Sequence, residues 1–264
     1  MPYSLFSRFQ GGLGGSGVGG RLRPQDPDWL RWDQVQTVVL ARLLQSPIFP
    51  PDAELLPLFP LNEPPQSDRW LSGLALGLLP LLLWEYESQP RLPNVVTLLT
   101  LTDEDLAWLW IWAIALHQGL GGQLLDLPQW RQLATHYPII EPFTRICDTV
   151  AIAPAQSPLS VALACAALTP EDPDLSIHCA QSHSPLAAAL TASLMGIYHG
   201  AYSFPTPSRQ DEARQLFARW AGQDGATDAD MTLALAPGGL LSPPRPRPLV
   251  SQVPMRREGR GNRE

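Results

Sequence analysis

A polar turn of four residues, Gln181-Ser182-His183-Ser184, separates two runs of helix-forming sequence. The imidazole of His183 has the chemistry of a metal ligand or a general base. A histidine in an exposed polar loop is, in the other interpretation, simply solvated. The turn therefore offers one group with catalytic chemistry, flanked by two weakly binding hydroxyls.

A second polar stretch, Ser67-Asp68-Arg69, lies directly before the apolar run from Leu71 to Trp84. A carboxylate can hold a hard cation, and a guanidinium can hold a phosphate or another anion. The alternative is structural, because Ser67 or Asp68 at the N-cap of the following helix accounts for both residues. With 14 residues and Pro80 inside it, the apolar run is too short for a membrane span of about 20 residues, and it predicts a buried core helix.

Three consecutive helices are expected to position the polar turn. Ser157-Pro158 suits a helix start, and the prolines from 170 to 173 end that helix. A short helix is expected from Asp174 to Ala180. Pro185 opens a third helix that reaches about Ala201, and its small residues predict a central helix with close neighbours.

Further helices are predicted along the rest of the chain. Four of them cover 27–45, 127–135, 142–152 and 209–220, the last after the cap Ser208. Another begins after the cap Thr102 and ends at 119–122. The seven prolines of 46–66 predict an extended surface connection. No β pattern of any length is present, so the fold class is all-α.

The glycine-rich segment near the start contains the pattern G-x-G-x-x-G from Gly12 to Gly17. A dinucleotide loop needs a preceding apolar strand, and residues 1–10 are too short and too polar to provide one. The glycines instead predict a helix that other helices approach closely.

The order of these elements resembles the ADP-ribosylglycohydrolase (dinitrogenase reductase-activating glycohydrolase-like) family. The resemblance covers about Phe9 to Pro205 and is strongest over Ser157 to Pro205, where the helix ALACAAL and the closing residues MGIYHGAY match well. The opening helix matches at Phe9, Gly11, Leu13, Gly15 and Gly19. The resemblance implies a compact single-domain multi-helix globule, with a pocket where the helix starts at Ser67 and Pro185 converge.

Active members of that family use two Mg²⁺ ions, held by carboxylates at those two helix starts, to hydrolyse a glycosidic bond from ADP-ribose. Here Ser182 and Ser184 stand where the family has aspartates, Arg69 replaces an anion, and only Asp68 keeps an acid. Mg²⁺ requires oxygen ligands and charge compensation, so this change predicts that the two-metal centre is lost and that no cofactor is bound. The positions that correspond to the metal site, and that are the candidate ligand-binding residues, are Ser67, Asp68, Arg69, Ser182, His183 and Ser184.

Three functions follow from this comparison. The leading one is a degenerate, non-catalytic member with a residual role in binding ADP-ribose or a related nucleotide, or in protein interaction. The second is an active Mg²⁺-dependent hydrolase that uses divergent ligands. The third is a helical scaffold without a small-molecule ligand.

The charge distribution divides the chain into a domain at 1–222 and a linker with a disordered tail at 223–264. All 18 basic residues are arginine, which excludes Schiff-base chemistry and a lysine-dependent phosphate loop. Six of these arginines lie in 243–264, where they make the tail about +4 and leave the remainder about −11. Nucleic acid is therefore not expected as a partner, whereas the Pro/Arg-rich tail is a candidate for binding a protein.

The cysteines and the N-terminal residues indicate the compartment. Cys147, Cys165 and Cys179 lie in apolar helical context and are predicted to be reduced core thiols, which favours a reducing compartment. No signal peptide or membrane helix is evident, so a cytoplasmic location is expected.

Overall fold

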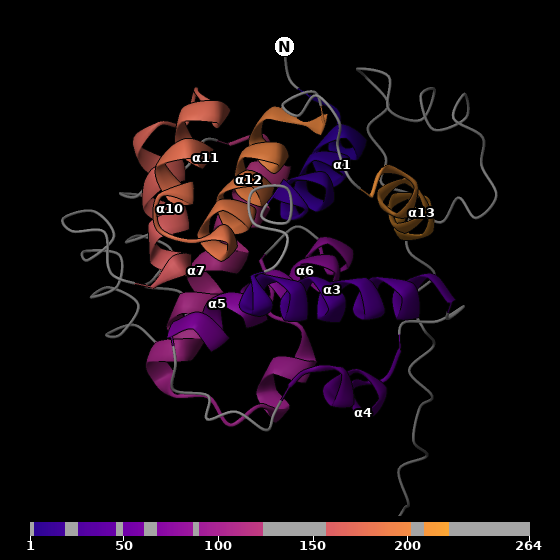
Figure 1. Cartoon of the computed structure of the whole chain (residues 1–264). Coiled ribbons are helices and arrows are strands. Elements are labelled where there is room, and N and C mark those ends of the chain that lie inside the picture. The colour runs from indigo at the N-terminus through magenta and orange to yellow at the C-terminus, as the bar shows by residue number, and fades with distance from the viewer. Residues whose placement is uncertain are drawn as a thin grey trace, which may run out of the picture.

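The computed structural model describes residues 3–18, 26–45, 50–60, 68–86, 90–123, 157–201 and 209–221. Within these ranges the regular elements are helices and no strand occurs, which confirms the all-α class (Figure 1). The elements are α1 (Leu5–Ser16), α3 (Pro27–Gln45), α4 (Asp52–Leu55), η1 (Leu56–Leu58), α5 (Asp68–Gly77), α6 (Leu79–Trp84), η2 (Asn94–Leu98), α7 (Asp103–Leu120), α10 (Pro158–Leu168), α11 (Pro173–Gln181), α12 (Pro185–His199) and α13 (Gln210–Trp220).

Helices α1 and α12 form the closest pair in the fold. A Cβ atom added to Gly11 would lie 1.9 Å from the carbonyl oxygen of Gly196, and one added to Gly15 would lie 2.2 Å from that of Ala192. Both distances are far inside van der Waals contact, so only glycine fits at these two positions of α1. The predicted close approach of small residues, with the 185–201 helix central, is confirmed.

Helices α10, α11 and α12 lie together on one side of the molecule (Figure 1). Ser157 caps α10 by accepting from the Ser160 N–H at 3.1 Å, as predicted. The other end is held by His199, whose Nε2 lies 2.6 Å from the carbonyl oxygen of Pro170. Because α12 ends where α10 ends, the polar turn before α12 lies toward the end at which α10 begins.

Helices α3, α5, α6 and α7 build the remainder of the core. Trp32 of α3 lies directly over Gly73 of α5, and the indole of the fully buried Trp112 of α7 donates to the Ala75 carbonyl at 3.1 Å. The apolar run is broken at Leu78, between α5 and α6, with Pro80 in the first turn of α6. The predicted interruption by Pro80 is confirmed, since proline fits a helix start but not its interior.

Two predictions about connecting segments were wrong. The Pro-rich segment does not form a purely extended surface connection, because α4 and η1 lie within it and Leu55 and Phe59 are buried. Helix α13 begins at Gln210, with Arg209 rather than Ser208 at the N-cap position and no side-chain cap. The left-handed backbone of Arg209, with φ of 60°, starts the helix in place of a serine cap.

The cysteine prediction was wrong in one position, because Cys165 is buried whereas Cys179 is exposed. None of the helices in the described ranges is both long and apolar enough to span a membrane. Cys147, the helices expected over 127–135 and 142–152, and the tail 223–264 lie outside the described residues.

Candidate functional site

At the start of α5, the predicted site residues lie on the surface. Asp68 is the first residue of the helix and is exposed. The guanidinium of Arg69 donates to the Asp28 carboxylate at 3.2 Å, and these two side chains are 76% and 48% exposed. Such an exposed pair contributes little to stability, because water screens both charges. Ser67 lies outside the described residues.

In the turn between α11 and α12, the two serines satisfy backbone groups at helix ends. The Ser182 hydroxyl donates to the Cys179 carbonyl at 2.7 Å, and the Ser184 hydroxyl accepts from the Ala187 N–H at 3.0 Å as the N-cap of α12. His183 is exposed between them. The hydroxyls of Ser182 and Ser184 therefore stabilise helix termini.

The two halves of the predicted site lie at the starts of α5 and α12, and both of these helices pack against α10. Helix α5 packs against both α10 and α12, and Ser72 of α5 accepts from the Leu159 N–H of α10 at 3.0 Å. Across the described ranges, however, no hydrogen bond or ion pair links Asp68 or Arg69 to the 182–184 turn. A search of the same ranges for three or more His, Cys, Asp or Glu side chains able to hold a metal ion found none.

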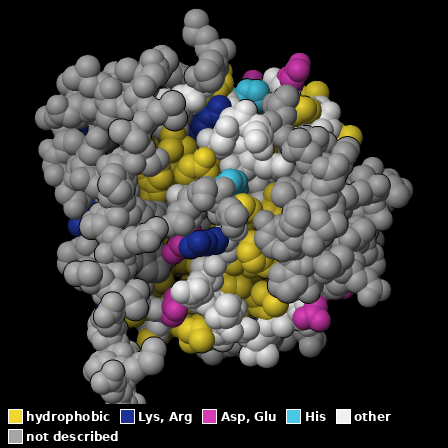
Figure 2. Space-filling view, turned by 180° about the vertical axis from the view of Figure 1, so that it is seen from behind, with side chains coloured by type: hydrophobic (Ala, Val, Ile, Leu, Met, Phe, Trp, Pro, Cys, Tyr) yellow, Lys and Arg dark blue, Asp and Glu magenta, His cyan; other side chains and the backbone are white. Residues whose placement is uncertain are grey.

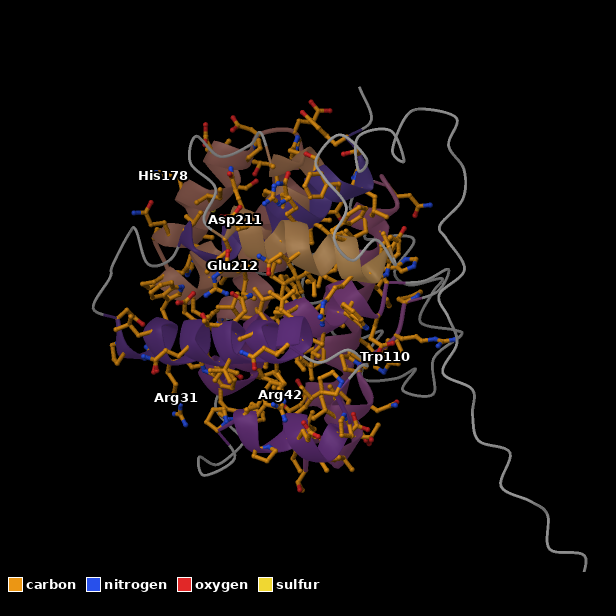
Figure 3. All side chains as sticks on the ribbon, turned by 90° about the vertical axis from the view of Figure 1, so that its right-hand side faces the viewer. Arg31, Arg42, Trp110, His178, Asp211 and Glu212 are labelled. Carbon is orange, nitrogen blue, oxygen red and sulfur yellow. The ribbon has the colours of Figure 1, made fainter. Side chains whose placement is uncertain are left out.

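A partly buried polar cluster that sequence analysis did not predict joins α13 to α3. The Arg209 guanidinium donates to the Asp33 carboxylate at 2.5 Å, to the Gln36 Oε1 at 2.5 Å and to the Thr37 hydroxyl at 2.8 Å. Ser16 of α1 also donates to Gln36 Oε1, at 2.8 Å. In Figure 3, α13 lies beside α3, with Asp211 and Glu212 labelled at its start.

Burial sets the electrostatics of this cluster. It raises the pKa of Asp33 above its ordinary value, and the nearby Arg209 opposes that shift. Burial likewise lowers the pKa of Arg209, against the opposing effect of Asp33 and Glu212. The Arg209 guanidinium bonds to both the Asp33 carboxylate and the Gln36 amide oxygen. The cluster therefore has a structural role, in which it links α13 to α3.

A second buried cation, Arg8 of α1, lies where α7 and α12 end. Its guanidinium donates to the carbonyl of Gly119 and, at 3.3 Å, to that of Ile197, and its Nε donates to the Tyr3 carbonyl at 3.2 Å. Carbonyl groups at helix C-termini carry partial negative charge and stabilise a cation. Burial lowers the pKa of Arg8, and Tyr86, Tyr198 and Tyr3 oppose that effect.

A shallow hollow opens between α6 and α7. The rings of Tyr86 and His117 pack at 5.1 Å between centroids on its wall, and Glu85 and Arg91 also line it. Its cavity volume is about 10 Å³, whereas ligand pockets begin at about 300 Å³. The hollow is too small to enclose a nucleotide.

The fold and the candidate residues define an all-α protein whose predicted site positions cap helices or lie on the surface. Comparison with family models, with curated proteins and with solved structures found no match.

Proposed function

We propose that this chain is a non-catalytic protein of the ADP-ribosylglycohydrolase type, which acts by binding ADP-ribose or a related nucleotide at the start of α5. The observation that carries the proposal is the use of the side chains at the expected metal positions. Ser182 and Ser184 bond to helix ends, and Arg69 forms an ion pair. None of these three side chains is an anionic ligand.

The charge at the start of α5 supports binding rather than metal-assisted hydrolysis. A pair of Mg²⁺ ions brings four positive charges, and hard cations of this kind require several carboxylate oxygens. Asp68 provides one carboxylate, and the permanent cation of Arg69 follows it directly. Arg69 also pairs with Asp28, so the two carboxylates near this helix start share one permanent cation and are poorly suited to hold two Mg²⁺ ions.

Arg69 is the side chain best suited to hold a nucleotide. A guanidinium forms paired, charge-assisted hydrogen bonds with phosphate oxygens, and the N-terminus of α5 adds partial positive charge. A ligand must displace Asp28, but the exposed ion pair costs less than about 1 kcal/mol to break. Arg69 is thus available to a diphosphate without disturbance of the core.

A helical scaffold without a small-molecule ligand is the second candidate function, because the core of the described helices is filled. Trp112, Leu74 and Leu76 are fully buried among them. The hollow between α6 and α7 is also below nucleotide size. A scaffold would present helical surfaces to a protein partner and would not respond to ADP-ribose.

A thermal-shift titration with ADP-ribose, run once with Mg²⁺ and once with EDTA, distinguishes these functions. A ligand at 100 times its Kd adds about 2.7 kcal/mol to the stability of the native state. We expect a rise in Tm that is the same in both buffers and is lost in Arg69→Ala. The matched control is Arg42→Ala, because Arg42 also forms a surface ion pair, with Glu54, away from α5.

The other outcomes each reject the proposal. A shift that requires Mg²⁺ would favour the active hydrolase with divergent ligands. No shift in either buffer would favour the scaffold. An equal loss of the shift in Arg69→Ala and Arg42→Ala would reject Arg69 as the binding residue.

A further inference from the structure

Two cysteines on facing helices come together at the surface of the α10–α11 pair. Cys165 of α10 is 5% exposed, and Cys179 of α11 is exposed. The Cys179 side chain also contributes to raising the pKa of Cys165, as expected for neighbouring groups. One sulfur of the pair is therefore open to solvent and the other is covered.

Other contacts of Cys165 show how α10 and α11 are aligned with each other. The Ser176 hydroxyl of α11 donates to the Cys165 carbonyl at 3.4 Å, and Ala180 of α11 belongs to the same small buried cluster as Cys165. Cys179 lies one helical turn after Ser176 and next to Ala180, so it is on the edge of the same face. The cluster also contains Ala187, and residues this small permit close approach of the helices.

We propose that Cys165 and Cys179 form a thiol–disulfide exchange site that reacts with small-molecule disulfides and closes an internal disulfide bond. This inference does not depend on the proposed nucleotide function. It requires only that a disulfide reaches the exposed sulfur and that the covered sulfur is within bonding reach after a small adjustment of the side chains.

The reaction proceeds in two exchange steps. The Cys179 thiolate attacks a small disulfide, R–S–S–R, so that a Cys179–S–S–R bond forms and one R–S⁻ leaves and takes up a proton. Cys165 then loses its proton and attacks the Cys179 sulfur, which forms Cys165–S–S–Cys179 and releases the second R–SH. The two cysteines lose two electrons in total, and the small disulfide gains them.

The environment of Cys165 supports this order of steps. Burial raises its pKa to about 12, with a further contribution from the neighbouring Cys179. A thiol held in its protonated form is a poor first nucleophile. Cys165 therefore suits the resolving step, when the Cys179 sulfur is already activated as a disulfide.

Oxidised glutathione is the probe for the test, applied to the full-length chain. We expect the intact mass to fall by two hydrogens, without a retained glutathione. Cleavage at acidic residues then separates the two cysteines, because Glu171, Asp172 and Asp174 lie between them. The fragments should remain linked until a reductant is added.

Single serine variants, which preserve size, assign the roles. Cys165→Ser should retain glutathione on Cys179, and Cys179→Ser should react at least about 10-fold more slowly. Cys147→Ser is the control and should form the link at the native rate. The oxidised native chain should also melt about 5 °C or more higher than the reduced chain, because the bond closes a short loop.

Several results would overturn the proposal. These are glutathione that stays on Cys179 in the native chain, a link that involves Cys147 or a second chain, or a Cys179→Ser variant that reacts as fast as the native protein. A Tm that falls on oxidation would likewise show that the pair cannot close without damage to the fold.

Discussion

Buried arginines in this protein are compensated in two different ways. Arg209 faces the Asp33 carboxylate and a buried amide, whereas Arg8 is surrounded by carbonyl groups at the ends of α7 and α12. A carboxylate provides a full negative charge, and helix ends provide only partial charges. Among the partners of Arg209, Asp33 is the carboxylate, and a single substitution can remove its charge.

Asp33→Asn should lower the free energy of unfolding by about 1–3 kcal/mol, because it leaves Arg209 with a neutral partner in a largely buried setting. Urea unfolding followed by circular dichroism measures the change. The matched control is Asp28→Asn, which removes the exposed partner of Arg69 and should cost less than about 1 kcal/mol. Equal losses in the two variants would contradict a buried structural role for the Arg209 pair.

Tyr198 should make stability depend on alkaline pH. Its hydroxyl donates to the Ala115 carbonyl at 3.0 Å, and burial raises its pKa above the ordinary value of 10.0. A raised pKa means that the contribution to stability is complete below pH 10 and is lost as pH rises further, since only the unfolded chain then ionises.

Tyr198→Phe tests this sign. At pH 7 the variant should be about 1 kcal/mol less stable than the native protein, through loss of the hydrogen bond. Above about pH 10 the difference should shrink, because phenylalanine carries no ionisation cost. A difference that stays constant between pH 7 and pH 11 would contradict the assignment.

At the scale of single residues, the sequence predicted local roles better than distant ones. Thr102 was predicted as a helix cap, and it forms a reciprocal capping box with Asp105. The capping signal is contained within four consecutive residues. The contact between Arg209 and Asp33 joins positions 176 residues apart, and no local pattern encodes it. Cys179 was misplaced for a similar reason, because the exposed side of α11 depends on where α10 and α12 lie.

At the scale of elements, the packing of α1 on α12 is the most demanding contact. Gly15→Ala should destabilise the protein by about 3 kcal/mol, because its Cβ would lie 2.2 Å from the backbone of Ala192 and backbone cannot yield as a side chain does. The melting temperature should fall accordingly.

Gly121→Ala is the control for that substitution. Gly121 has φ of −72°, and the nearest atom to an added Cβ is 3.4 Å away, which is ordinary contact. We expect a change of less than about 1 kcal/mol. If both alanine variants melted at the same temperature, close backbone contact between α1 and α12 would be refuted.

Helix bounds were largely predictable from the sequence because the signals are local. Pro27, Pro158 and Pro185 each lie in the first turn of a helix, as expected. The burial of Leu55 and Phe59 was not predictable, because the prolines around them indicate irregular backbone but not its depth in the fold. Which helices pack together was suggested by small residues alone, most directly by the glycines of α1.

At the scale of the whole molecule, α10, α11 and α12 lie on one side of a second group that contains α3, α5, α6 and α7 (Figure 1). On the face in Figure 2, apolar side chains are visible over a broad area, and the few basic side chains stand apart from one another. Among the described side chains on the face shown, no continuous basic field of the kind that holds nucleic acid is visible.

The candidate site was predictable in composition but not in geometry. The sequence places a hydroxyl, an imidazole and a guanidinium near two helix starts, and those types are fixed whatever the fold. Their contacts were not predictable, since Arg69 could have turned toward the 182–184 turn instead of pairing with Asp28 on α3. The choice between these positions depends on how α3 packs against α5.

The central claim is that the chain binds without catalysis. The most direct test incubates the purified protein with Mg²⁺ and an ADP-ribosylated peptide, and follows free ADP-ribose by chromatography. We predict release no faster than in the same buffer without protein, because Asp68 is the one acid at the expected metal positions. Release that increases with protein concentration and stops in EDTA would contradict the account and identify an active metal-dependent hydrolase.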